Sequence, residues 1–150
     1  MPPPKPYAGS VSKRHQQRQQ IMACLYMQDM QPEENIEMLY HAYCEEIGIS
    51  DELDSSSFIL ETLRKIRQHQ ASIDTILQQH AENWAFGRIA KVELAILRLG
   101  IYELCFGAST PPPVVINEAI ELSKEYASED SKRFINGVLD RIATEKTSSC

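Results

Sequence analysis

Apolar residues recur at spacings of three and four positions through most of the chain, and no alternating strand pattern competes with them. The pattern predicts an all-α fold of about seven helices, whose short connections favour antiparallel neighbours. Serines, glycines and prolines mark where each helix begins and ends. The predicted helices are 13–30, capped by Ser12; 32–48, from Pro32 to Gly48; a third that follows an acidic loop at 49–55 and Ser55–Ser57; a fourth capped by Ser72; 85–106; 114–126; and a seventh capped by Asp130 or Ser131.

The last predicted helix contains a conflict between two local signals. Asn136-Gly137 is a strong turn signal, yet the apolar residues on both sides of it keep the helical spacing. A turn would split the apolar stripe, whereas a helix would carry an interior glycine that costs about 1 kcal/mol relative to alanine. The stripe consists of Phe134, Ile135, Val138, Leu139 and Ile142.

The length of 150 residues favours one domain with its own hydrophobic core. We expect a flexible proline-rich arm at 1–12, a single helical domain at 13–146 and a short tail at 147–150. No stretch is apolar enough to span a bilayer, and the N-terminus lacks the apolar region of a signal peptide. These features predict a cytoplasmic protein without a membrane partner.

The charge of the chain is unevenly distributed. The net charge is −6, but residues 1–28 contain four basic residues and no acidic residue, so this segment is +4 and residues 29–150 carry −10. A basic arm on an acidic body can bind phosphate locally, or it can be a solubilising tail. Charge alone leaves these two interpretations equally open.

The residues that usually carry chemistry are scattered. The four cysteines are far apart and form no CxxC pair, which favours free thiols over disulfides. No histidine pair has metal-ligand spacing, and no phosphate-binding glycine loop, nucleophile elbow or HExxH motif is present. We therefore expect no metal site, no cofactor and no enzymatic activity. The cysteines are Cys24, Cys44, Cys105 and Cys150, the last of which lies in the predicted tail.

Three stretches together resemble the NusB family of bacterial transcription antitermination factors. The most specific is INEAIELSKEYASEDSKRFINGVLDRI, which is similar to the C-terminal signature of that family. NWAFGRIAKVELAILRLGIYEL resembles its central long helix, and KRHQQRQQIMACLYMQ resembles its N-terminal arginine-bearing helix. They occur in the expected order and cover most of 13–142, while about 29–75 matches only in helical character.

This resemblance implies a fold and a function. NusB-like proteins are all-helical, form two small helical bundles and are not enzymes. They bind the boxA element of nascent ribosomal RNA, which is single-stranded there, together with NusE, a protein of the small ribosomal subunit. The resemblance thus implies an RNA-binding antitermination factor within a transcription complex. The alternative is a helical protein–protein adaptor or homodimer that does not bind RNA directly.

The first candidate RNA-binding group lies at the start of the first helix. Arg14 and Arg18 are four residues apart and share one helical face, and with Lys13 they can contact phosphates. The other interpretation is a solvated helix end. His15 and Gln16 stand where family members often carry further arginines.

The second candidate RNA-binding group opens the last helix. Lys132 and Arg133 oppose the helix dipole there, which suits a site that serves an anion. Phe134 can stack on an unpaired base or can be the first core residue of the stripe. Asn136 offers both donor and acceptor groups. The resemblance favours a helix that continues through Gly137. Because glycine has no side chain, another backbone can come close to the helix there. That backbone can belong to a packed helix, which is the preferred alternative, or to RNA.

The resemblance also implies a surface for NusE. NusE is basic as a ribosomal protein, so acidic and aromatic residues suit it. The two tyrosines of this set can equally be core residues with a hydroxyl at the edge. The candidates are Tyr26, Glu82, Glu93, Tyr102 and Glu103.

Overall fold

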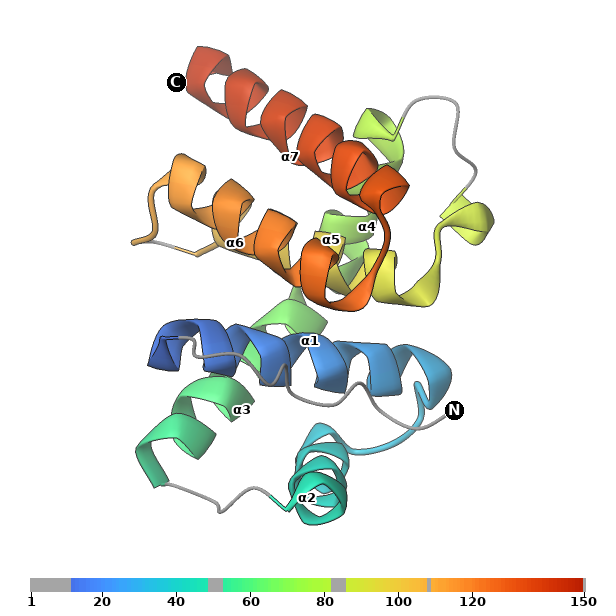
Figure 1. Cartoon of the computed structure of the whole chain (residues 1–150), viewed down its shortest axis with the longest axis vertical. Helices are drawn as coiled ribbons and strands as arrows, with labels where there is room; N and C mark the ends of the chain where they lie inside the picture. Colours follow the sequence, from blue (N-terminus) through green and yellow to red (C-terminus); the bar gives the residue numbers. More distant parts are fainter. Residues whose placement is uncertain (1–11, 49–52, 82–85, 108, 150) are drawn as a thin grey trace. The chain divides into compact units, whose positions relative to one another are not determined.

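The computed structural model describes residues 12–48, 53–81, 86–107 and 109–149, and it is all-α over these residues (Figure 1). Seven α-helices and one 3₁₀ turn are present, which confirms the predicted fold class. None of the described helices combines the length and apolar character that crossing a bilayer needs. The elements are α1 (Lys13–Met30), α2 (Ile36–Ile47), α3 (Leu53–Gln68), α4 (Gln70–His80), η1 (Phe86–Arg88), α5 (Lys91–Cys105), α6 (Pro112–Tyr126) and α7 (Glu129–Ser149).

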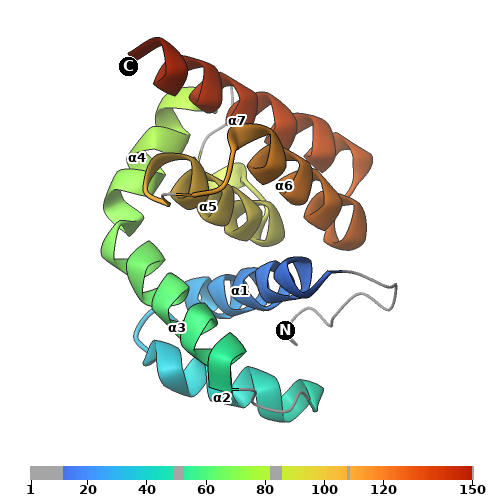
Figure 2. The same cartoon turned by 90° about the vertical axis from the view of Figure 1, so that its left-hand side faces the viewer.

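The chain divides into two compact units, Met1–Gln68 and His69–Cys150. In the first unit, α1, α2 and α3 pack on one another, and in the second unit α5, α6 and α7 pack together with α4 against α5 and α7. Figures 1 and 2 both show α6 and α7 side by side and antiparallel. The single domain expected at 13–146 stays a prediction. The predicted tail begins inside α7, which continues to Ser149.

The first unit buries the apolar stripes of its three helices, as their spacing predicts. Tyr40 and Tyr43 of α2 and Ile59, Leu63 and Ile66 of α3 are almost completely buried. Burying side chains of this size contributes about 1.5–3 kcal/mol each relative to leaving them exposed. The patterned positions therefore account for the core that fixes α1 against its neighbours.

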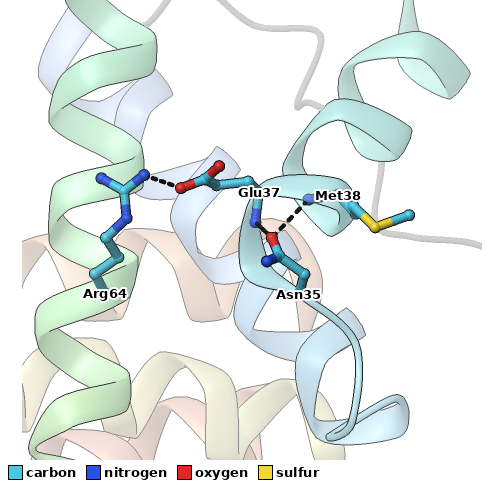
Figure 3. A network of polar contacts seen from close by, with 4 residues as sticks. All are labelled: Asn35, Glu37, Met38 and Arg64. Carbon is cyan, nitrogen blue, oxygen red and sulfur yellow. Dashed lines mark hydrogen bonds and ion pairs between the residues drawn. The ribbon is translucent and has the colours of Figure 1, made fainter.

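The predicted start of the second helix was wrong, because a better cap lies three residues further on. The Asn35 side-chain oxygen accepts the backbone N–H groups of Glu37 and Met38 at 2.8 and 3.3 Å (Figure 3). Pro32 instead lies in the preceding turn, which is held by Arg67, a donor to the Pro32 carbonyl. The predicted end was correct, since Gly48 caps α2 with a φ of 78°.

Three further predicted helix starts were wrong, one of them that of α6, which begins at Pro112 and not at 114. The third helix already includes Leu53, so the last part of the predicted loop at 49–55 is helical, whereas 49–52 lie outside the described residues. The fourth begins at Gln70, and Ser72 lies within its first turn; His69 is the cap residue and makes no side-chain capping bond. Helix formation in α3 and α4 therefore extends into polar residues before the apolar stripe begins.

The long helix predicted at 85–106 is interrupted. The 3₁₀ turn Phe86–Arg88 precedes an extended Ala90, and α5 starts only at Lys91. The Glu93 carboxylate accepts the Ala90 N–H at 3.0 Å, which satisfies a donor that a continuous helix would have used internally. The sequence signal for this break was Glu93, a glutamate at the third position of the helix. The signal was weak because no serine or threonine stands at the cap position before it.

The last helix runs straight through Asn136-Gly137, which confirms the continuous helix that the resemblance favoured over the turn signal. The predicted cap was wrong by a few residues, because the Ser128 hydroxyl, not Asp130 or Ser131, accepts a first-turn N–H at 3.2 Å. This start places Ser131 inside the first turn as the donor of that bond.

The preferred reason for Gly137, close helix packing, was wrong. A Cβ atom built at Gly137 has no neighbour within 4 Å, so no other helix approaches it. The close approach occurs instead at Gly100 of α5, where a Cβ atom would lie 3.0 Å from a methyl group of Leu139 of α7. The glycine that packs tightly is thus the one within the long apolar stripe, where no turn signal draws attention to it.

Candidate nucleic-acid interface

The N-terminus of α1 presents the first group of predicted RNA-binding residues. The Ser12 hydroxyl accepts the His15 N–H at 3.1 Å and fixes the first turn. Lys13 and Arg14 are exposed on this turn. The Arg14 guanidinium lies over the ring of Phe58 of α3, 4.3 Å from its centroid. The contact orients the charged group without a carboxylate.

Two other predicted residues of α1 are buried. Arg18 and Tyr26 are both 4% exposed. Arg14 and Arg18 therefore differ in accessibility, although their spacing places them on one helical face. For Tyr26, the burial agrees with the core interpretation that the sequence had left open. A direct contact of either side chain with a ligand would require it to become uncovered.

The second group lies on the first half of α7. Arg133 and Asn136 are exposed, while Lys132 and Phe134 are half-buried. The Lys132 ammonium is 3.9 Å from the Glu129 carboxylate, one turn earlier. Because Arg133, Asn136 and Gly137 are three and four residues apart, they share one face, and the space beside Gly137 is open. A flexible partner can therefore approach the helix backbone there.

The arginines of the described residues differ in the groups that their guanidiniums bind. Arg64 pairs with Glu37 (Figure 3), and Arg98 binds both oxygens of Asp74 at 2.9 Å. Others donate to backbone carbonyls: Arg67 to Pro32 and Glu34, and Arg141 to His80. Within the described part of the chain, by contrast, no acidic group forms an ion pair with Arg14 or Arg133. Of the three predicted RNA-binding arginines, Arg14 and Arg133 thus keep donors available for an anion.

The predicted partner-binding residues are mostly engaged with their own unit. Glu93 is half-buried, and its carboxylate caps α5. Tyr102 is 9% exposed and its carbonyl accepts the Gly107 N–H at 2.7 Å, while Glu103 is half-buried. Glu82 lies outside the described residues. The structure thus brings Tyr102 and Glu103 to the C-terminal end of α5.

The cysteines show no sign of an activated nucleophile. Cys24 and Cys44 are buried free thiols and Cys105 is a half-buried one, as predicted for these three; Cys150 lies outside the described residues. Burial, with a smaller contribution from Cys44, raises the pKa of the Cys24 thiol, and burial also raises the pKa of Cys105. Thiols with raised pKa values are poor nucleophiles and poor metal ligands. Among the described residues, no cluster of three potential metal ligands is present.

Sequence comparison supports one family over nearly the whole chain. The NusB family model matches residues 15–144. A transcription antitermination protein NusB from Oleidesulfovibrio alaskensis is 38% identical over 138 residues, which cover 90% of this chain and 90% of that protein. NusB proteins are antitermination factors and not enzymes.

Structural comparison agrees. NusB of T. maritima matches with a TM-score of 0.78 at 32% identity, covering 91% of this chain and 94% of that one. A chain in the crystal structure of the antitermination factors NusB and NusE in complex with dsRNA matches with a TM-score of 0.77 at 30% identity, covering 89% of this chain and 99% of that one. Fold, sequence and domain coverage lead to one conclusion: the chain belongs to the NusB family.

Proposed function

We propose that this chain is a cytoplasmic transcription antitermination factor that binds boxA-type RNA of nascent ribosomal RNA transcripts together with NusE. The observation that carries the proposal is its similarity, over nearly its full length, to a chain crystallised with NusE and RNA. The RNA of that complex is double-stranded, whereas we propose a single-stranded target. The form of the RNA is therefore part of the test.

Two exposed cationic groups support RNA binding in this chain. Lys13 and Arg14 begin α1, and Arg133 lies on the open face of α7 near Asn136. The two arginines have no acidic partner among the described residues, so phosphate binding to them breaks no ion pair with a described residue. Because the body of the protein is acidic, these groups supply local attraction within a repulsive field.

The remaining predicted residues have supporting roles in this proposal. Lys132 and Phe134 flank Arg133 on α7, where the ring can stack on a base from its exposed edge. Arg18 joins the phosphate contacts if it is uncovered on binding. The proposed NusE surface includes Glu93 and Glu103, and with them the predicted set of Tyr26, Glu82 and Tyr102. The acidic groups of this surface suit a basic ribosomal protein.

The test is binding of a short single-stranded boxA-like RNA, with and without NusE, over a salt series. Scrambled single-stranded RNA and a duplex RNA serve as comparisons. We expect tighter binding to the boxA-like strand when NusE is present. Arg14→Ala should lower the affinity and should reduce the salt slope by about one unit for the lost phosphate contact.

The matched control is Arg64→Ala, in the same unit. Arg64 is also exposed, but its guanidinium is bound to Glu37, so its loss should leave the RNA affinity and the salt slope nearly unchanged (Figure 3). Equal binding to all three RNAs, or none even with NusE, would contradict the proposal. The chain would then be a protein-binding helical adaptor or a homodimer, and the oligomeric state in solution would separate these two.

A further inference from the structure

Phe58 lies in α3 and contacts the start of α1. Its apolar neighbours Ile59 and Leu63 are fully buried in the first unit, but Phe58 itself is half-buried. The ring of Phe58 carries the guanidinium of Arg14, which is 4.3 Å from its centroid. The aromatic residue thus supplies a partly exposed platform next to the basic end of α1.

A guanidinium that lies over an aromatic ring is held without a carboxylate. The attraction comes from the negative charge on the face of the ring, within the distance range of a cation–π contact. The N–H donors lie in the guanidinium plane and point outward from its edge. An arginine held in this way keeps both its charge and its donors for a second ligand such as phosphate.

The arginine of α3 that pairs with an acid shows the opposite arrangement. The Arg64 guanidinium is fixed by the Glu37 carboxylate, which offsets its charge and accepts a hydrogen bond from one of its terminal nitrogens (Figure 3). Arg14 is fixed instead by an uncharged ring, and no acidic partner among the described residues competes for it. Two exposed arginines in the first unit are therefore ordered by different means, and only Arg14 remains able to bind an anion strongly.

We infer that Phe58 is a positioning residue for RNA binding, which holds the Arg14 guanidinium in the orientation that receives a phosphate. The inference rests on the proposed function. Ordering a long arginine side chain before binding removes an entropic cost that the complex would otherwise bear. Losing the ring should lower the affinity for RNA even though the positive charge remains.

A double-mutant cycle tests this inference with the full chain, NusE and the single-stranded boxA-like RNA. The variants are Phe58→Leu, Phe58→Tyr, Arg14→Ala and the combination of Phe58→Leu with Arg14→Ala. We expect Phe58→Leu to weaken binding by about threefold to tenfold, since cation–π contacts have this magnitude. Phe58→Tyr keeps an aromatic face and should bind within about twofold of the natural chain.

The salt series separates positioning from charge. Phe58→Leu should leave the salt slope unchanged, because Arg14 is still present, whereas Arg14→Ala should reduce it by about one unit. In the Arg14→Ala background, Phe58→Leu should have no further effect. Circular dichroism and urea unfolding would identify any variant that has lost its fold, and the tyrosine variant keeps the test valid in that case.

Three results would overturn the inference. An equal loss from Phe58→Leu in both backgrounds would assign Phe58 a purely structural role. Unchanged affinity of Phe58→Leu, or an affinity of Phe58→Tyr as low as that of the leucine variant, would show that the aromatic face does not matter. If the natural chain with NusE binds none of the RNAs, the proposed function fails and this inference fails with it; in the other cases only the inference does.

Discussion

Two residue types occur in contrasting places of the second unit, once inside and once on the exposed face of α7. Arg98 of α5 has a side chain 7% exposed and forms two hydrogen bonds to Asp74 of α4, whereas Arg133 of α7 is exposed. Gly100 meets Leu139 closely, whereas Gly137 faces open space. An arginine and a glycine thus contribute to packing on α5, whereas an arginine and a glycine on α7 remain accessible.

The difference shows how this unit separates stability from binding. The face of α7 that includes Leu139 contacts α5 so closely that an additional methyl group at Gly100 would require the Leu139 side chain to shift. The face that includes Arg133 and Gly137 makes no comparable contact and is available to a ligand. Substitutions on the first face should therefore change folding, while substitutions on the second face should change binding.

The largest effect is expected when the buried ion pair is broken. Arg98→Ala leaves the Asp74 carboxylate, which is 21% exposed, without its bidentate partner. We expect the free energy of unfolding to fall by about 3 kcal/mol, the lower end for a buried pair because Asp74 keeps some contact with water. Urea unfolding followed by circular dichroism measures this loss.

The control for this change is Arg133→Ala. An exposed arginine without an acidic partner among the described residues should change the unfolding free energy by no more than about 0.5 kcal/mol. The affinity for RNA should respond in the opposite order, so that Arg133→Ala lowers it more than Arg98→Ala does. If both variants were equally destabilised, the contrast between the two arginines would have no basis.

A smaller effect is expected from filling the space at Gly100. Gly100→Val should destabilise the protein by about 2 kcal/mol, because its branched side chain would overlap Leu139. Thermal unfolding measures the loss. Leu139→Ala should relieve the clash, so Gly100→Val should cost less in that background than in the natural chain. Additive effects of the two substitutions would argue against close packing at this contact.

Apolar spacing was sufficient to predict the helices, but most of their first residues were not predicted correctly; the Ser12 cap of α1 is an exception. The last helix is continuous, as the resemblance implied, because burial of several side chains outweighs the cost of one glycine. Helix starts depend on which of several neighbouring polar residues reaches a free N–H group. Asn35 and Ser128 make that bond, whereas the second helix had been predicted to start at Pro32 and the last one to be capped by Asp130 or Ser131.

The exposure of the candidate RNA-binding residues was predictable only in part. Arg14 and Arg133 were identified from their position at helix starts, and both are exposed. The burial of Arg18 was not predictable, because the spacing that pairs it with Arg14 does not show what packs on α1. The contact of Phe58 with Arg14 joins two helices far apart in the sequence, and no local pattern contains it.

Apart from the Arg133→Ala control, the smallest effect on stability, and the most informative, is expected at Gly137. Gly137→Ala removes the conformational freedom of a helix-interior glycine and adds a methyl group in open space, so it should stabilise the protein by about 0.5–1 kcal/mol. If RNA approaches the backbone here, the same methyl group should weaken binding to the boxA-like strand. Unfolding and RNA-binding measurements on one variant therefore give changes of opposite sign. A stabilised variant with unchanged affinity would place the RNA elsewhere on the protein, and a destabilised one would mean that a neighbour does pack against Gly137.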